Sequence, residues 1–301
     1  MTIKNRSRIC LIVSGCIIAL ALILSIFGLG INMGIDFAGG MSMQYDMHAD
    51  VAQTDVEAVL NEMGLSGTSV TVQGANHNET YIRIPTVGDD EVQNIQHTFL
   101  EKIKEKYPET TQSGDVSYVG PVAGRTLLSN AFWSVVIASV LMLVYIAFRF
   151  DLNSGLAAVF GLVHDVLMML AFMVLLRSII QMNSTFIAAM LTIVGYSINN
   201  TIVIFDRIRE NVRKMPSVSR ETVVNTSVRE CLGRTLNTTA TTLVTIVMLY
   251  ILGVSSIKEF ALPIIIGVLS GVYSANMING YVWAMLEGKL GKGRKKAASK
   301  A

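Results

Sequence analysis

The sequence predicts an α-helical membrane bundle of six transmembrane helices, with a small α+β domain between the first helix and the second. Hydrophobic residues make up 51% of the 301 positions and charged residues only 15%, which leaves too little polar surface for a soluble protein. Six segments reach about 20 mostly apolar residues, the length that crosses a bilayer. Between the first two segments the composition becomes polar and mixed, which indicates a separate domain.

The predicted spans cover residues 9–30, 127–148, 156–176, 185–205, 235–252 and 260–286. They divide the chain into an N-terminus with the first helix (1–33), an extracytoplasmic domain (34–125), a five-helix transmembrane region (126–286) and a basic tail (287–301). The first span begins with Lys4, Arg6 and Arg8, as signal peptides do, but its apolar part is longer and no A-x-A cleavage site follows. We interpret it as a retained anchor.

Lysine and arginine predict the orientation of the spans. The N-terminus, the turn at Arg149, segment 207–234 and the tail fall on one side if the spans alternate, whereas the opposite short loops contain only Arg177 and Lys258. The positive-inside rule places the basic side and both termini in the cytoplasm, which predicts a multi-pass membrane protein. The tail serves first as a topology determinant, and second as a contact for anionic lipid or the ribosome.

Cysteine and histidine usage predicts neither a cofactor nor a metal. Cys10 and Cys16 lie in the first span and Cys231 in a cytoplasmic segment, so the extracytoplasmic domain has no disulfide framework. The histidines of that domain are scattered, without metal-ligand spacing. The domain also shows no set of nucleophile, base and orienting group, so we expect no enzyme. The nearly balanced net charge of +2 gives no sign of nucleic-acid binding.

Strand and helix patterns alternate in the extracytoplasmic domain. Strands are predicted at 41–47, 68–73, 80–84 and 116–119, and helices at 54–63, behind a possible Thr54 cap, and at 89–107. This βαββαβ order is that of the split βαβ, ferredoxin-like fold. Because that fold hosts many functions, it indicates only a compact module.

Glycines flank the domain on both sides. The motif GIDFAGG places Gly34, Asp36, Gly39 and Gly40 after the first span, and Gly124 precedes the second. Glycine permits close backbone paths, so these residues predict a hinge or junction that would let the domain tilt. A phosphate loop is the weaker alternative, because the motif lacks the lysine and the following helix of a P-loop.

Polar residues interrupt the fourth span, in the segment VGYSINNTIVIFDRIRENVRK. In a helix, Gly195, Asn199 and Asp206 share one face, and Asn200 lies beside them. Polar side chains at membrane depth face a bundle interior, a water-filled path or a partner. Asn199 and Asn200 therefore either hydrogen bond between helices or take part in transport. Asp206 lies where a solvated helix end is equally expected.

Two other spans carry polar groups that need an explanation. His164 and Asp165 lie near the middle of the third span, where an unpaired charge costs roughly 3 kcal/mol, so they need partners. They either stabilise helix packing or transfer protons, since histidine titrates near neutral pH.

The fifth and sixth spans carry polar and small residues as well. In the fifth span, Arg234 begins a stripe of hydroxyl side chains on one helix face: Thr238, Thr241 and Thr245. The stripe either continues the polar face from the arginine or consists of threonines that bond their own backbone or let helices approach. The sixth span has a small-residue face that predicts helix packing only: Gly267, Ser270, Gly271 and Ser274.

Together these motifs resemble a known family. GIDFAGG (34–40), FRFD (148–151), VHDV (163–166), GYSINNT with FDRIREN (195–211) and RTLNTTATTL (234–243), in this order, are similar to the SecF family of bacterial protein export, part of the resistance-nodulation-division superfamily. The resemblance implies a heterodimer with SecD, whose homologous six-span half would complete a twelve-span unit, and association with the SecYEG channel. YajC and a YidC-type insertase, unfolded exported polypeptide and membrane lipid are the other implied partners.

At one position the chain departs from the family pattern. The fourth span of the family usually reads GYS-x-N-D, and its aspartate works with an arginine at the start of the fifth span. Here the arginine is Arg234, but the aspartate position is Asn200. An amide does not titrate in the usable pH range. Either the asparagine is native and SecD or His164 with Asp165 carries the coupling, or it was introduced to trap one state.

The resemblance implies a non-enzymatic transport subunit that couples the proton or sodium gradient to translocation or release of exported polypeptide. One charge crossing the membrane gains about 2.3 kcal/mol per 100 mV, enough to bias a hinged domain. Five residues are the ion-coupling candidates: Asn200, Arg234, Asp206, His164 and Asp165. Two alternatives remain, a passive scaffold that stabilises SecD and the channel, and a small-molecule or lipid exporter of the same superfamily.

Overall fold

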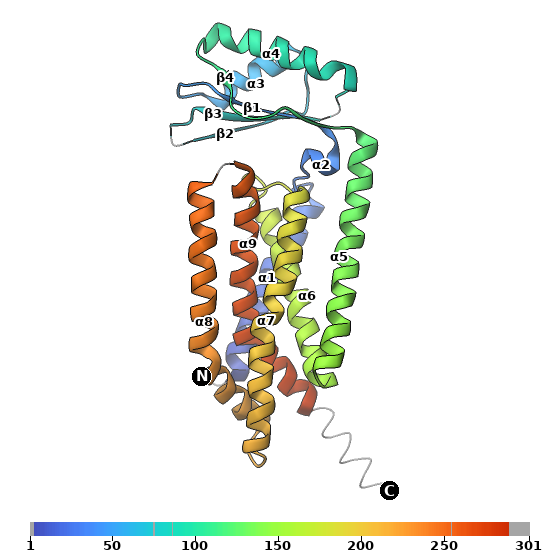
Figure 1. The fold of residues 1–301 in the computed structure, drawn as a ribbon, viewed down its shortest axis with the longest axis vertical. Helices are drawn as coiled ribbons and strands as arrows, with labels where there is room; N and C mark the ends of the chain where they lie inside the picture. Colours follow the sequence, from blue (N-terminus) through green and yellow to red (C-terminus); the bar gives the residue numbers. More distant parts are fainter. Residues whose placement is uncertain (1–2, 75, 86, 254, 289–301) are drawn as a thin grey trace. The chain divides into compact units, whose positions relative to one another are not determined.

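The computed structural model describes residues 3–74, 76–85, 87–253 and 255–288. It divides into two compact units, which we call the helical unit (Met1–Asn32 and Trp133–Ala301) and the α+β unit (Met33–Phe132). Figure 1 shows the elements of both. The predicted basic tail lies, beyond Gly288, outside the described residues.

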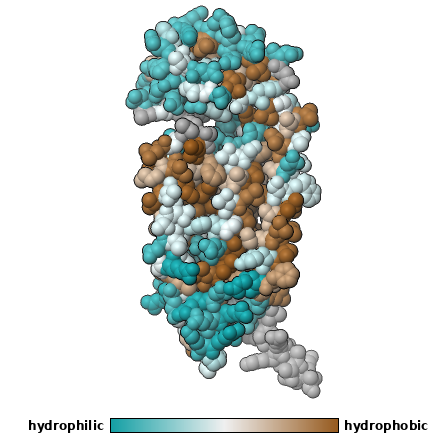
Figure 2. Space-filling view, viewed as in Figure 1, coloured by the Kyte–Doolittle hydropathy of each residue, from teal (hydrophilic) through white to brown (hydrophobic). Residues whose placement is uncertain are grey.

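Six helices are long and apolar enough to cross a membrane, which confirms the predicted number by length and composition. Their bounds are α1 (Ile3–Ile26), α5 (Pro121–Arg149), α6 (Leu152–Leu175), α7 (Ser184–Lys214), α8 (Arg220–Leu252) and α9 (Ser255–Ser274), which continues through a π-helical turn (Ala275–Asn279). The polar residues 206–214 and 220–234 are themselves helical, so α7 and α8 extend well beyond their predicted spans. Figure 2 shows apolar surface along the middle of the helices and hydrophilic surface where α7 meets α8.

Side-chain caps fix the start of three of these helices. Asp151 accepts a hydrogen bond from the backbone N–H of Ser154 at the start of α6, at 3.3 Å. Asn183 caps α7 in the same way, and Ser219 caps α8. Such caps satisfy backbone donors that the first helical turn leaves open, and each contributes about 1 kcal/mol.

The core of the helical unit lies where α9 packs between α6, α7 and α8. A Cβ atom built on Gly267 of α9 would lie 2.5 Å from Cγ1 of Ile193 on α7, and one on Gly271 would lie 3.2 Å from Cβ of Ser197. The two helices therefore approach as closely as glycine allows, which confirms the predicted packing role of this face. In contrast, only 6% of the residues are buried in the apolar segment of α5, and only 11% in that of α8.

The α+β unit contains a five-stranded antiparallel sheet of order β2-β3-β1-β4, with β5 also paired to β1. The strands are β1 (Gly40–Asp46), β2 (Ser69–Gln73), β3 (Glu79–Ile84), β4 (Thr111–Gln112) and β5 (Ser117–Val119). Helices α3 (Gln53–Glu62) and α4 (Val92–Lys106), the latter after a 3₁₀ turn (Asp89–Glu91), lie on one face of the sheet (Figure 1). Tyr45 of β1 packs on Phe99 of α4 with ring centroids 5.3 Å apart.

Every predicted strand and helix of this unit has a counterpart, but three details differ. The last strand is split into β4 and β5, and a short helix, α2 (Ile35–Ala38), forms within GIDFAGG. Thr54 is not the cap of α3, because the helix begins one residue before it and Ala52 occupies the cap position without a side-chain bond. Neighbouring polar pairs join α3 to α4 instead: Asp55 with Lys106 and with Tyr107, each at 2.7 Å.

Candidate functional site

Asp165 of α6 is the centre of a buried polar cluster. It is 1% exposed, and its carboxylate accepts hydrogen bonds from the hydroxyls of Ser270 and Ser274 on α9, both at 2.8 Å, and of Ser197 on α7. His164 lies beside it, with Nδ1 at 3.0 Å from Oδ1. The partners that an acid at membrane depth requires therefore come from helices α6, α7 and α9 together.

The close contact of α7 and α9 sets this geometry. Because residues 267 and 271 are glycines, the backbone of α9 comes near enough to α7 for serines of both helices to reach one carboxylate. Ser270 and Ser274 are one helical turn apart, so both hydroxyls point the same way. The small-residue face thus contributes hydrogen-bond donors as well as packing.

His164 extends the cluster toward α1. Its Nε2 lies 2.8 Å from the hydroxyl of Ser14, which lies 3.4 Å from the hydroxyl of Tyr273; this hydroxyl donates to the carbonyl of Cys10 at 2.8 Å. In the tautomer with hydrogen on Nδ1, His164 donates to Asp165 and accepts from Ser14; in the other tautomer, Nε2 donates to Ser14, whose own hydrogen then points to Tyr273. We call Asp165, His164, Ser14 and Tyr273 the polar chain.

The polar chain contains two side chains of the kinds that carry protons, a carboxyl group and an imidazole. Hydroxyl groups contact both oxygens of Asp165, and the ring of His164 lies between that carboxyl group and Ser14. The oxygens of Asp165 and its serines also have the hard character that small cations prefer. No cluster of three His, Cys, Asp or Glu side chains suited to a metal occurs among the described residues.

Asn200 is also buried, but it is not satisfied in the same way. It is 3% exposed, and its amide nitrogen has no hydrogen-bond partner within the described residues. Tyr196 bonds Thr242 and Asn211 bonds Ser227 across α7 and α8, and this antiparallel register puts Asn200 about one turn beyond the level of Arg234. Arg234 itself is exposed, so the structure places the two predicted partners on neighbouring helices without a bond between them.

An exposed polar surface runs along α7 and α8, which we call the open polar face. Its residues are Thr192, Gly195 and Asn199 of α7 and Arg234, Asn237, Thr238, Thr241 and Thr245 of α8. The α8 threonines donate to backbone carbonyls of their own helix, as when Thr238 bonds the Arg234 carbonyl at 2.9 Å. The alternative of backbone bonding therefore accounts for the stripe. Arg234, Asn237 and Asn199 have no bond of this kind in the described part of the chain.

Asp206 belongs to a group of ion pairs at one end of the helices. It pairs with Arg149 at 2.7 Å, both side chains being about two-fifths exposed, and this contact joins the FRFD and FDRIREN motifs. Arg207 bonds Glu230 at 2.6 Å and also Glu210. These contacts agree with a solvated helix end, one of the two possibilities that the sequence left open. None of these ion pairs includes a residue of the polar chain.

The glycines of GIDFAGG lie where the chain enters and leaves the α+β unit. Gly39 and Gly40 have φ values of +78° and +113°, and a Cβ on Gly40 would lie 2.4 Å from the carbonyl oxygen of Ile84. A Cβ on Gly124 would lie 3.1 Å from the Phe37 carbonyl oxygen. The glycines therefore permit close backbone contact. The predicted tilting at Gly34, Asp36 and these positions stays a prediction.

Sequence reasoning missed three members of the site, Ser14, Ser197 and Tyr273, and assigned Ser270 and Ser274 to packing alone. Ser14 and Tyr273 gave no signal, since single hydroxyls in an apolar span are common. The three serines that contact Asp165 share a target that becomes evident only when the helices are placed, because they lie 32 to 109 residues from it in the chain.

Comparison with known proteins identifies relatives along almost the whole chain. Residues 99–289 match the family model for the C-terminal part of the protein export membrane proteins SecD and SecF, and residues 24–51 match the SecD/SecF GG motif. A SecF protein translocase subunit of Alicyclobacillus acidocaldarius is 35% identical over 93% of this chain and 91% of its own length. The SecDF translocase subunit of Bacillus subtilis is 34% identical over 92% of this chain.

Solved structures agree with these relatives. The crystal structure of SecDF from Thermus thermophilus, a translocon-associated membrane protein, superposes with a TM-score of 0.82 at 31% identity and covers 94% of this chain. SecDF in a super-membrane-facing form gives a TM-score of 0.70 at 31% identity. The chain spans only 36% of the B. subtilis relative and 38% of the T. thermophilus structure.

Proposed function

The chain belongs to the SecD/SecF family of protein-export membrane proteins, and we propose that it is an auxiliary subunit that couples an ion gradient across the bacterial inner membrane to protein export. Its relatives are named as protein translocase subunits, which are transport proteins. We propose accordingly that it has no enzymatic activity and works with SecD beside the SecYEG channel, contacting exported polypeptide.

The buried acid Asp165 carries this proposal. An acid at membrane depth is costly and marks an ion pathway by default. Three serines bind its two oxygens and His164 continues the polar chain toward Ser14, so a change in protonation would alter contacts with three other helices at once. A change of this kind can shift how α1, α7 and α9 pack against α6, which is what coupling a gradient to movement requires.

Asn200 takes a secondary place in this mechanism. Its amide cannot titrate, so we propose that the proton, or a sodium ion in its place, is handled at Asp165 within this chain. If Asn200 and Arg234 keep the positions of a working pair, Asn200→Asp raises gradient-dependent export and adds a pH dependence. Arg234→Ala in that background abolishes the gain. If neither change has any effect, the two residues serve packing.

The open polar face is the proposed contact with SecD. Arg234, Asn237 and Asn199 are exposed on helices of a membrane-spanning unit, and polar groups in lipid require partners. A homologous six-helix half would cover them and would explain why the chain spans only part of its SecDF relatives. The first test is whether SecD copurifies with the full chain. The second is whether residues of the open polar face are protected from solvent or lipid in the presence of SecD and exposed in its absence.

We propose that the α+β unit is a ferredoxin-like domain, since its sheet order is that of a βαββαβ unit. We also propose that it lies outside the cytoplasm, because lysine and arginine concentrate on the other side of the spans. Ser66→Cys should react with an impermeant maleimide in intact spheroplasts. Ser217→Cys, exposed in the loop between α7 and α8, should react only after lysis. The native Cys231 is buried, so it is no control for sidedness. The opposite labelling pattern would reverse the orientation.

Secretion into inverted vesicles separates a driver from the alternatives. After ATP-driven insertion of a preprotein, completion of transport is followed with the gradient present and with it collapsed. A driver gives gradient-dependent completion that requires this chain, whereas a passive scaffold gives completion that needs the chain but not the gradient. The exporter alternative would need a pocket-lined outer region, and the α+β unit of about one hundred residues (Met33–Phe132) is small for that.

A further inference from the structure

An apolar groove of about 590 Å³ lies between α1, α6 and the last helix, by which we mean α9 and its continuation beyond the π-helical turn as far as Gly288, at the end of the helical unit that contains the N-terminus of α1. Its lining includes Leu11 of α1 and Leu156 and Phe160 of α6, with Val282 and Leu286 opposite. The size falls within the roughly 300–1,000 Å³ typical of sites that bind small molecules. Leu156 and Phe160 are 47% and 43% exposed, so the groove opens to the side of the bundle.

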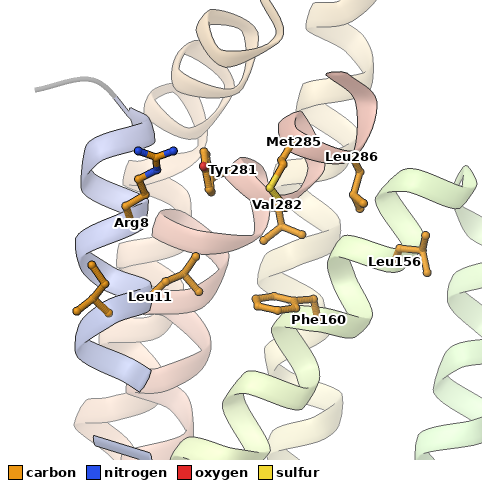
Figure 3. A pocket seen from close by; sticks show the side chains of 9 residues that line it. Arg8, Leu11, Leu156, Phe160, Tyr281, Val282, Met285 and Leu286 are labelled. Atoms are coloured by element: carbon orange, nitrogen blue, oxygen red, sulfur yellow. The ribbon is translucent and has the colours of Figure 1, made fainter. Parts of the chain in front are cut away.

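One cation stands at the mouth of this groove. Figure 3 shows Arg8 of α1 directed toward Tyr281, with Leu11 and Phe160 further from the chain terminus. No acidic side chain pairs with Arg8 among the described residues, and Glu287, the acid next to the lining residue Leu286, is bonded to Asn153 at 2.5 Å. Lys4 lies one helical turn before Arg8 on the same face and adds a second positive charge.

The polarity of the groove matches one class of membrane molecule. Moving from the helix end toward the middle of the span, a ligand meets the guanidinium of Arg8 and the phenol of Tyr281 first, and then apolar side chains such as Leu11 and Phe160. A phosphodiester headgroup followed by an acyl chain has this order of chemistry, and arginine pairs with phosphate through two parallel hydrogen bonds. A packed protein helix would have to bring its own acid to Arg8.

We propose that this groove binds one anionic diacyl phospholipid, its phosphate held by Arg8 and Tyr281 and one acyl chain in the apolar part. The bound lipid then links α1 to α6 and to the last helix, next to the helices that hold the polar chain. An anionic headgroup is favoured over a zwitterionic one because Arg8 and Lys4 are not neutralised in the described residues.

Native mass spectrometry of the full chain measures this directly. The protein is reconstituted in nanodiscs of phosphatidylglycerol and phosphatidylcholine in equal parts, released, and the retained lipid is counted. One phosphatidylglycerol per chain is expected, in preference to phosphatidylcholine. Arg8→Gln should reduce retention about fivefold, the equivalent of about 1 kcal/mol per basic residue at an anionic surface, whereas Arg6→Gln, on another face of α1, should not.

A second pair of variants tests the apolar part. Leu156→Trp fills the groove and should expel the lipid, whereas Leu152→Trp, exposed on the same helix outside the lining, should leave it bound. Equal loss with Arg6→Gln and Arg8→Gln, or equal retention of phosphatidylcholine, would overturn the proposal. A photo-crosslinking residue at position 156 should form lipid adducts in membranes; adducts to protein instead would assign the groove to a partner helix and contradict it.

Discussion

Two groups of polar residues lie within the membrane-spanning helices, and they differ in whether this chain satisfies them. Around Asp165 each carboxylate oxygen has hydroxyl donors from this same chain. On the open polar face, Arg234 and Asn237 are exposed, and the buried amide nitrogen of Asn200 lacks a partner within the described residues. We call the first group, Asp165 with the serines that donate to it, the finished site, because its hydrogen-bond partners all come from this chain. The second group has no such donors or acceptors from other helices for Arg234, Asn237 or the amide nitrogen of Asn200 among the described residues, and the two groups should therefore respond differently to substitution.

The largest expected effect is steric and falls on the finished site. Gly271→Leu would force side-chain atoms into Ser197, which is already 3.2 Å from a Cβ at that position. We expect a loss of about 3 kcal/mol, the upper range for overpacking, and poor accumulation of folded protein by thermal unfolding and gel filtration. Gly195→Leu on α7, where a Cβ meets nothing within 4 Å, is the control and should be tolerated. Equal damage from both would show that α7 and α9 do not pack as described.

The next effect compares two hydroxyls. Ser274→Ala removes a donor to a buried carboxylate and should cost about 2 kcal/mol. Thr245→Val removes a hydroxyl of the open polar face that bonds only its own helix at 3.2 Å, and it should change stability by less than about 0.5 kcal/mol. Thermal unfolding of the two full-length variants in the same detergent measures the difference. If Thr245→Val destabilised the protein more than Ser274→Ala, the threonines of the open polar face would be packed against another part of the protein, which would contradict the description.

A third prediction concerns binding and not stability. Arg234→Gln should leave the melting temperature of the isolated chain unchanged, because the side chain is exposed. It should weaken association with SecD about tenfold, as expected for one charge-assisted hydrogen bond in an interface. Arg229→Gln, exposed on the same helix, should not. Titration of tagged SecD against the three proteins in detergent decides this, and unchanged affinity would place the SecD contact elsewhere.

The smallest expected effect lies in the α+β unit, where polar pairs are exposed to water. Hydrogen bonds from Lys106 and Tyr107 hold the pKa of the Asp55 carboxyl below its usual range. A depressed pKa stabilises the fold at pH values above the ordinary carboxyl pKa, and this stabilisation is lost as pH falls through the lower, folded-state value. Asp55→Asn should therefore weaken amide protection of α3 and α4 in hydrogen exchange at pH 7, and the difference from the parent should shrink as pH falls below the ordinary carboxyl pKa. A difference that persists there would mean that the pair acts through packing.

Local patterns in the sequence predicted the helices, the order of strands and helices along the chain, and the need of Asp165 for partners. Apolar length identifies a span and period-two alternation identifies β1, since both depend on a few neighbouring residues. Which helices meet is not a local property. Asp165 needed partners, but only the placement of α9 beside α7 reveals that Ser197 and Ser274 supply them. The split of the last strand escaped for the same reason, because β4 and β5 are defined by their pairing with β1.

The family resemblance directed attention to Asn200 and Arg234, whereas the structure shows the stronger polar site elsewhere. Asn200 is buried beside α8, and Arg234 is exposed one turn away in register. Their proposed pairing depends on a partner or on another conformation, neither of which a single chain contains. His164 and Asp165 were predicted to need partners, either for helix packing or for proton transfer, and these partners are present in the chain.

The most direct test of the account is gradient-dependent export with Asp165→Asn. This change keeps the size of the side chain but replaces its ionisable carboxyl group with an amide, which does not titrate. In inverted vesicles that contain SecD, we predict that ATP-driven insertion continues at its normal rate, while completion no longer responds to the gradient and loses its pH dependence. SecD should still copurify, which shows that the complex is intact. If Asp165→Asn instead retains full gradient dependence with an unchanged pH profile, the polar chain is structural and coupling lies outside this chain.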